Sequence, residues 1–205
     1  MIHAVSPKLT GGTGSAYGPG AIVKHARCAR PPTQESRHGH LDRPAPWPHR
    51  PRPDQGEALW FFGCLVTVKA SAGTTGGRVA VLEHLAPRGA GSPLHVHRRE
   101  DEWFYVTEGE LTFWLGGRTV AAPAGSFVFG PRDVPHTFEV ASERARWLLV
   151  TEPAGFEEFV RAVAEPAAAL TLPPPPAEPP DLGRIGALAA KHGLEFLGPP
   201  GIPAA

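Results

Sequence analysis

The sequence of 205 residues is poor in several residue types, and each shortage narrows the class of protein. It contains only two cysteines, Cys28 and Cys64, which lie in different regions and form no Cys-x-x-Cys pair. A disulfide framework or a cysteine-ligated zinc site needs more cysteines at closer spacing. Two isolated thiols are typical of a reducing compartment, so we expect a cytoplasmic location.

Long apolar segments are also missing. No run approaches the roughly 20 apolar residues that span a bilayer, and the N-terminus lacks the short apolar core of a secretory signal peptide. Its basic residues are interrupted by proline and glycine, which break the amphipathic helix of a transit peptide. We therefore expect no membrane partner.

An excess of charge of one sign is absent as well, because 20 Lys and Arg balance 20 Asp and Glu. Residues 1–54 hold eight basic and three acidic residues, which leaves 12 and 17 in the rest of the chain. This acidic remainder gives no surface for nucleic acid. Asparagine is absent and lysine is scarce, whereas Ala, Gly, Pro and Arg abound. That bias is typical of GC-rich coding and suggests a bacterial source.

The first 56 residues are rich in Pro, Gly, Arg and His and show no apolar periodicity. Such a segment buries too little apolar surface to offset the entropy cost of ordering it. We predict that residues 1–56 form a disordered tail. Its histidines, His38, His40 and His49, are better explained by a solvated tail than by a metal site.

Residues 57–153 alternate short apolar segments with Gly and Pro turns, which is typical of an antiparallel β-barrel or jelly roll. Gly116-Gly117 marks a two-residue hairpin turn. We therefore predict an all-β domain, with strands near residues 58–69, 78–85, 93–97, 102–107, 110–115, 118–122, 126–130, 136–140 and 146–151.

Four side chains in this domain have spacings that suit one metal ion. His95 and His97 alternate on a predicted strand, so both point to the same side. Glu102 begins the next strand, and His136 begins a third. Imidazole and carboxylate ligands suit Fe, Mn, Ni, Co, Cu or Zn. A single histidine on an apolar strand is more often a hydrogen-bonded core residue, but the joint pattern favours a metal site.

The flanking residues turn this pattern into a family resemblance. Gly89 precedes His95 by six positions, Gly109 follows Glu102, and Gly125 and Pro131 precede His136. The two segments resemble the two motifs of the cupin family, which implies a single cupin barrel. The resemblance also implies one divalent transition metal bound by four residues: His95, His97, Glu102 and His136. In the second motif, Asp133 and Val140 replace the usual Gly and Asn, which affects turn geometry and packing more than coordination. We place His84, a further histidine, outside the ligand set.

The phrases Tyr-Val-Thr-Glu-Gly at 105–109 and Pro-Ala-Gly-Phe-Glu at 153–157 are similar to those of small quercetin dioxygenase-like cupins. That likeness implies a dioxygenase that uses O2 on a small enolisable or flavonol-like substrate. It also implies that Glu102 is either a plain ligand or a catalytic base that takes the substrate's hydroxyl proton. A metal-dependent isomerase, cyclase or epimerase is an alternative function, and so is a non-enzymatic ligand-binding cupin. The oligomeric state is a separate question, for which a homodimer is one answer.

Strand parity suggests the walls of a substrate pocket. If Glu102 and His136 point inward, so do the alternate residues on their strands and one face of strand 110–115. An aromatic-lined pocket would suit a planar apolar substrate, although these side chains also suit a plain barrel core. The predicted pocket residues are Phe104, Val106, Phe113 and Phe138.

Residues 154–205 carry two helical patterns separated by a proline-rich linker. Apolar residues recur at helical spacing over 155–165 and again over 182–192, where Asp181 can cap the helix. The linker at 166–180 is stiffened by four successive prolines. We expect the helices to pack on the outside of the barrel or on a partner subunit, or to cover the barrel mouth.

Overall fold

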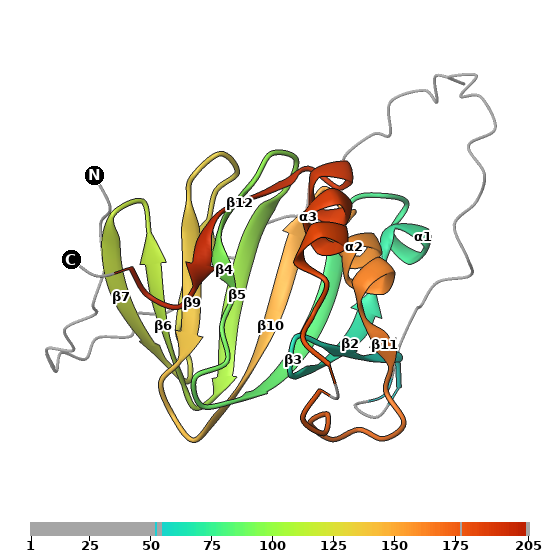
Figure 1. Cartoon of the computed structure of the whole chain (residues 1–205), viewed down its shortest axis with the longest axis horizontal. Coiled ribbons are helices and arrows are strands. Elements are labelled where there is room, and N and C mark those ends of the chain that lie inside the picture. The colour runs from blue at the N-terminus through green and yellow to red at the C-terminus, as the bar shows by residue number, and fades with distance from the viewer. Residues whose placement is uncertain (1–51, 53–54, 177, 204–205) are drawn as a thin grey trace, which may run out of the picture. The chain divides into compact units, whose positions relative to one another are not determined.

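A computed structural model describes Arg52 and residues 55–176 and 178–203. The predicted disordered tail therefore lies outside the described residues, except for Arg52, Gln55 and Gly56. The described chain is mostly β-strand, arranged in two antiparallel sheets with a few helices (Figure 1). This arrangement confirms the predicted all-β class.

The larger sheet has seven strands and contains Glu102, one of the four predicted ligands. Its central strands alternate buried and partly buried side chains, as expected for a sheet with one face on a core. In spatial order the strands are β11 (Glu165–Pro166), β1 (Glu57–Phe61), β2 (Cys64–Ala70), β3 (Ala80–Pro87), β10 (Arg144–Glu152), β5 (Asp101–Glu108) and β8 (Phe127–Gly130).

The smaller sheet has five strands and carries all three predicted histidine ligands. Its central strand β9 pairs with β4 at His95 and His136, and with β6 along its whole length. In spatial order the strands are β12 (Leu194–Pro200), β4 (Pro93–His97), β9 (His136–Val140), β6 (Glu110–Leu115) and β7 (Arg118–Pro123).

The core lies between the inner faces of the two sheets. Phe104 of β5 meets Phe113 of β6 with ring centroids 5.0 Å apart, and Phe138 of β9 meets Trp147 of β10 at 5.2 Å. Each pair joins one sheet to the other. Burial of large aromatic side chains is the main source of stability for such a sandwich.

Glycine conformation sets the predicted hairpin between β6 and β7. Gly116 and Gly117 have φ angles of 55° and 87°, the left-handed values that a two-residue hairpin turn needs. The strands then pair from Leu115 and Arg118 outward to Glu110 and Pro123. The turn therefore fixes the register that sends Leu111 and Phe113 into the core.

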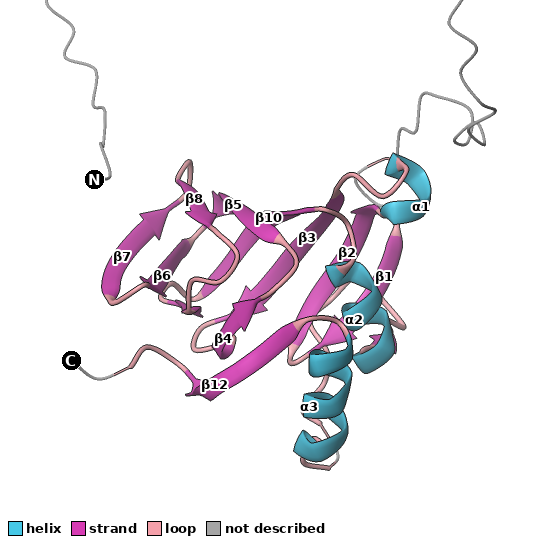
Figure 2. Cartoon of the chain, turned by 90° about the horizontal axis from the view of Figure 1, so that it is seen from above, coloured by secondary structure: helices cyan, strands magenta, loops and turns pink. Residues whose placement is uncertain are grey.

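Three helices complete the described chain: α1 (Ala72–Thr75), α2 (Phe156–Val163) and α3 (Leu182–Lys191). Helices α2 and α3 confirm the two C-terminal helical patterns, and they lie next to each other in both views (Figure 2). The side chain of Asp181 accepts a hydrogen bond from the backbone N–H of Arg184, as expected for a helix cap. No helix among the described residues is long and apolar enough to cross a membrane.

The structure differs from the predicted elements in the short α1 and β11, which were not predicted, and in two longer segments. The single strand expected over 58–69 is a hairpin, β1–β2, that turns at Phe62 and Gly63 with φ angles of 49° and 80°. An apolar residue in the left-handed region conceals this turn in the sequence. The second difference is β12, which extends the smaller sheet beyond β4 after α3. Its interrupted apolar pattern ends in Gly and Pro and resembles a loop.

Candidate metal centre

The two sheets bring the four predicted ligands together from opposite sides. His95 and His97 share one face of β4, and His136 lies beside His95 as its register partner on β9. Glu102 comes from the other sheet, where it is the second residue of β5 and pairs with Thr151 of β10. The site therefore bridges the sandwich.

The ligand atoms converge within a few ångströms. One donor atom from each of the four residues lies within 4.8 Å of all the others. The Nε2 atoms of His95 and His97 are 3.2 Å apart. The carboxylate of Glu102 lies close to two of the rings. Its Oε1 is 3.3 Å from His97 Nε2, and its Oε2 is 2.7 Å from His136 Nε2. All four side chains are at most 7% exposed.

The opposite nitrogen of each ring is held by a partner outside the centre. His95 Nδ1 donates to the carbonyl of Pro93 at 2.7 Å, and His136 Nδ1 donates to the carbonyl of Val134 at 2.9 Å. A carbonyl can only accept, so both rings carry a proton on Nδ1, and each ring when neutral presents a lone pair at Nε2. Such outward partners orient histidine ligands and fix their tautomer.

His97 has a different outward partner, a buried carboxylate. Its Nδ1 lies 3.4 Å from Glu100 Oε2, and Glu100 is only 3% exposed. The other oxygen of Glu100 lies against the start of α2, since a Cβ on Gly155 would come within 3.0 Å of Oε1. Phe156 then packs its ring edge-on against His97, with centroids 5.3 Å apart. Glu100 thus connects a candidate ligand to helix α2.

Burial and neighbouring charges shift the pKa values of His95, Glu102 and His136 in different directions. Burial lowers the pKa of His95 to about 3, and the neighbouring His136 and His97 add to that effect. Burial also opposes the charged forms of Glu102 and His136, but their neighbours outweigh it. The charge of His97, then the hydrogen bond and charge of His136, lower the pKa of Glu102, and Glu102 in turn raises the pKa of His136. The pKa of Glu102 therefore falls to about 2, and the pKa of His136 rises above its ordinary value. Without a cation, the pair Glu102–His136 holds the proton of the site.

The donor set fits a divalent transition metal. Two Nε2 lone pairs 3.2 Å apart repel each other unless a cation lies between them, and a buried carboxylate needs a positive partner. Three imidazoles and one carboxylate satisfy both needs and suit the borderline metals from Mn to Zn. Four protein ligands also leave coordination positions for a substrate.

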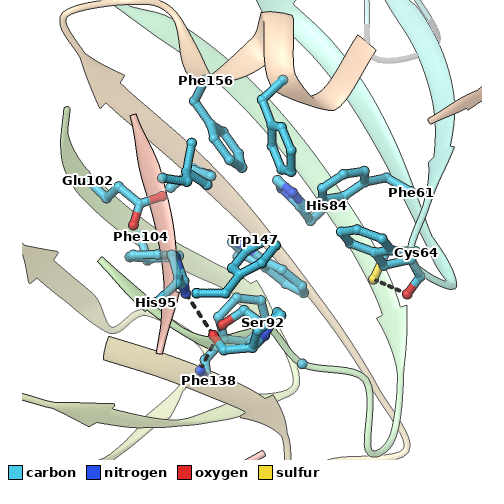
Figure 3. Close-up of a pocket in the computed structure, with 17 residues that line it drawn as sticks. Phe61, Cys64, His84, Ser92, His95, Glu102, Phe104, Phe138, Trp147 and Phe156 are labelled. Atoms are coloured by element: carbon cyan, nitrogen blue, oxygen red, sulfur yellow. Dashed lines mark hydrogen bonds between the residues drawn. The ribbon is translucent and has the colours of Figure 1, made fainter. Parts of the chain in front are cut away.

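A pocket opens directly onto this centre. His95, Glu102 and Ser92 form part of its wall (Figure 3), and Pro93 also lines it. Most of the remaining lining side chains are aromatic or aliphatic, drawn from β1, β5, β9, β10, α2 and β12. They include Phe61, Phe104, Phe138, Trp147, Phe156 and Phe196.

Comparison with known families identifies the fold. The sequence matches the Cupin domain family over residues 81–151, which contain all four converging side chains. Residues 81–151 therefore form a cupin domain. Over 112 residues the chain is 28% identical to quercetin 2,3-dioxygenase of Bacillus subtilis (strain 168). That match covers 55% of this chain and 33% of the enzyme, so the chain spans about a third of its curated relative.

Several solved cupin structures are similar in outline. A RmlC-like cupin from Shewanella frigidimarina NCIMB 400 has a TM-score of 0.48 and 20% identity, covering 54% of this chain and 96% of that one. A predicted oxalate decarboxylase from Thermotoga maritima has a TM-score of 0.46 and 22% identity, covering 51% and 96%. The nucleoside dehydratase Pac13 from Streptomyces has a TM-score of 0.45 and 19% identity, covering 53% and 85%.

In this cupin, the predicted pocket residues divide into two groups. Phe104 and Phe138 line the pocket. Val106 and Phe113 point inward as parity requires but lie behind the lining, each with 0% exposure, and Phe113 packs on both lining phenylalanines. The alternation of side chains along a strand predicts which face of the sheet a residue lies on. It does not predict whether that residue lines the pocket or packs behind it.

The two departures from the cupin motif have a structural meaning. Asp133 replaces the usual glycine and has a φ of 64°, the left-handed conformation that favours glycine at that position. Aspartate tolerates this conformation better than most residues, and here it accepts a hydrogen bond from Arg98 at 2.9 Å. Val140 replaces the usual asparagine and is fully buried in the core. Both departures lie away from the donor atoms.

Sequence reasoning missed several residues that reach the site. Glu100 lies between the predicted strands 93–97 and 102–107, and nothing in its spacing marks it as buried. Phe61, Phe156 and Phe196 come from three distant elements that only the fold brings to the pocket. The helical pattern that contains Phe156 was predicted, but it did not indicate that this side chain lines the pocket.

Proposed function

We propose that this cupin binds one divalent transition metal through His95, His97, Glu102 and His136 and oxidises a small enolisable or flavonol-like substrate with O2. One observation carries the proposal: four buried donor atoms converge at the wall of an aromatic-lined pocket. The likeness to the Bacillus subtilis enzyme over this region supports the choice of reaction. A redox-active metal at such a site would supply the one-electron chemistry that O2 requires.

The protein's own side chains would perform three tasks. The aromatic walls would hold a flat substrate and keep water away from its reactive carbon. Phe156, which packs on His97 and lines the pocket, would close the side next to α2. Glu102 would take the substrate's hydroxyl proton on a carboxylate oxygen as the substrate becomes an anion.

Metal analysis followed by oxygen uptake tests this proposal. The protein is purified without a histidine tag, its metal content is measured, and flavonols and other enolisable compounds are screened with an oxygen electrode. We expect one metal per chain and metal-dependent O2 uptake. His97→Ala removes one ligand and should empty or weaken the site and abolish uptake. Full metal occupancy with unchanged affinity in that variant would refute the ligand assignment.

The same screen separates the two alternatives. Conversion of a compound without O2 consumption would point to a metal-dependent isomerase, cyclase or epimerase. Thermal stabilisation by a ligand without conversion would point to a binding protein. We also propose a cytoplasmic location, because Cys64 is a free and buried thiol whose pKa is raised to about 12 by burial.

A further inference from the structure

His84 is a histidine in the pocket that the metal centre does not use. It lies on β3, is 5% exposed, and lines the same pocket as Glu102 and His95. Its ring stacks on Trp147 with centroids 4.8 Å apart and an angle of 9° between the planes. This stack holds the imidazole in one orientation in the pocket wall.

The polar atoms of this stacked pair lack partners. Among the described residues, His84 Nδ1 and Trp147 Nε1 are buried without a hydrogen bond. The three histidines of the metal centre differ, because each has its Nδ1 within hydrogen-bond distance of a carbonyl or carboxylate oxygen. A buried polar atom without a partner is costly and rare in native proteins. Two such atoms on neighbouring rings therefore suggest that a ligand completes them.

His84 lies at a distance from the metal centre along the sheet. His84 pairs with Trp147 on β10, whereas Glu102 pairs with Thr151, four residues further along the same strand. Four residues span roughly 13 Å of strand. Figure 3 likewise shows His84 apart from Glu102 and His95. The pocket thus has a polar group near each end.

Charge decides what His84 can bind. Burial lowers its pKa to about 4, which outweighs the opposing effects of the Leu82 carbonyl and the Glu102 and Glu83 carboxylates. The Leu82 carbonyl influences the ring but lies outside hydrogen-bond geometry. At neutral pH the ring is uncharged and has one donor and one acceptor. That combination matches a hydroxyl group, which also donates and accepts.

We propose that His84 hydrogen-bonds an uncharged hydroxyl group of the substrate, on the part of the molecule remote from the metal. The substrate is then a flat aromatic compound with metal-binding oxygens at one end and a hydroxyl at the other. This inference rests on the proposed function for the metal-binding end. The contact at His84 concerns binding and is measurable without turnover.

Phenol and toluene provide the test, because they have nearly the same shape and differ in one hydroxyl group. Their dissociation constants for the metal-loaded protein are measured by ligand-observed NMR. His84→Leu removes both nitrogens, and His84→Phe removes them while keeping a ring to stack on Trp147. In both variants we expect phenol to bind about fivefold to tenfold more weakly and toluene to change little.

Phe196→Leu is the matched control, because Phe196 lines the same pocket from β12 without a polar atom. It should weaken phenol and toluene by the same factor. Contacts between phenol and the metal are common to all variants and cancel in the comparison. If His84→Leu and His84→Phe leave the ratio of the two dissociation constants unchanged, the inference is wrong. Metal content and melting temperature establish that each variant is folded.

Failure of the proposed function gives a different result. If no compound supports O2 uptake but phenol still depends on His84, the dioxygenase proposal fails and the hydroxyl contact stands. If O2 uptake occurs but phenol is indifferent to His84, the contact fails alone. Where turnover exists, His84→Leu should raise the KM for quercetin more than the KM for 3-hydroxyflavone, which lacks hydroxyls on its remote ring.

Discussion

The two polar ends of the pocket are built in opposite ways. At the metal centre, every histidine has an outward partner, and Glu102 contacts two of the rings. At the other end, His84 and Trp147 are equally buried but have unpaired nitrogens among the described residues. A network of hydrogen-bonded side chains is rigid before anything binds. A buried group without a partner contributes to binding when a ligand supplies its missing hydrogen bond.

The difference implies two kinds of response to mutation. Changes at the metal centre should affect metal binding and chemistry together, because its members hold one another in place. Changes at His84 should affect only the choice of ligand. The predictions below test this division, from the largest expected effect to none.

Glu102→Gln should have the largest effect on chemistry. Glutamine keeps the size and one oxygen ligand but loses the charge and the basicity. Three histidines still anchor the metal, so occupancy should fall only partly, whereas turnover per bound metal should fall by about 10²–10⁴. The quantity to measure is activity divided by metal content. Wild-type activity per metal would show that Glu102 is a plain ligand.

Glu100→Gln should weaken metal binding by about 10- to 100-fold, the usual cost of losing an outward partner of a histidine ligand. The control is Glu108→Gln, at the exposed far end of the same strand as Glu102, which should leave affinity unchanged. Competition with a chelator gives the affinity, and the visible spectrum of the cobalt-loaded protein reports ligand geometry. A spectrum and an affinity like those of the wild type would remove Glu100 from the centre.

Acid should release the metal before it changes His84. Burial lowers the pKa of His136, but the hydrogen bond to Glu102, the charge of Glu102 and the Val134 carbonyl together raise it more. The metal-free site therefore takes up a proton above the ordinary histidine value of about 6.5. A metal must displace that proton, so its affinity should fall as pH drops through this range. The pKa of His84, by contrast, is about 4. Metal content after dialysis between pH 8 and 5 checks the prediction, and flat retention would contradict it.

Removal of the N-terminal segment should have no effect at either end of the pocket. We propose that residues 1–56 form a separate tail, because they lack apolar periodicity and are rich in Pro and Gly. A chain that begins near Gly56 should keep the melting temperature and the metal content of the full chain. A clear loss of either would show that the segment packs on the cupin domain or on a partner.

Much of the metal centre was predictable because its geometry is local. Residues at positions i and i+2 of a strand lie on the same face, so His95 and His97 were predictable as a pair from their spacing. The positions of Glu102 and His136 at strand starts followed from the apolar segments after them. Gly116-Gly117 likewise marked a hairpin, because that turn needs two residues in the left-handed backbone conformation, which glycine adopts readily.

The sequence by itself therefore determined most of the strands, the family motifs and the four converging side chains. The tertiary structure decided what surrounds them. Glu100 became a partner of His97 only because α2 buries it, and β12 brought Phe196 to the pocket from a segment that resembles a loop. His84 became an unpaired group in a ligand pocket only because Trp147 stacks on it across two strands. Such contacts join residues far apart in the chain, and no local periodicity encodes them.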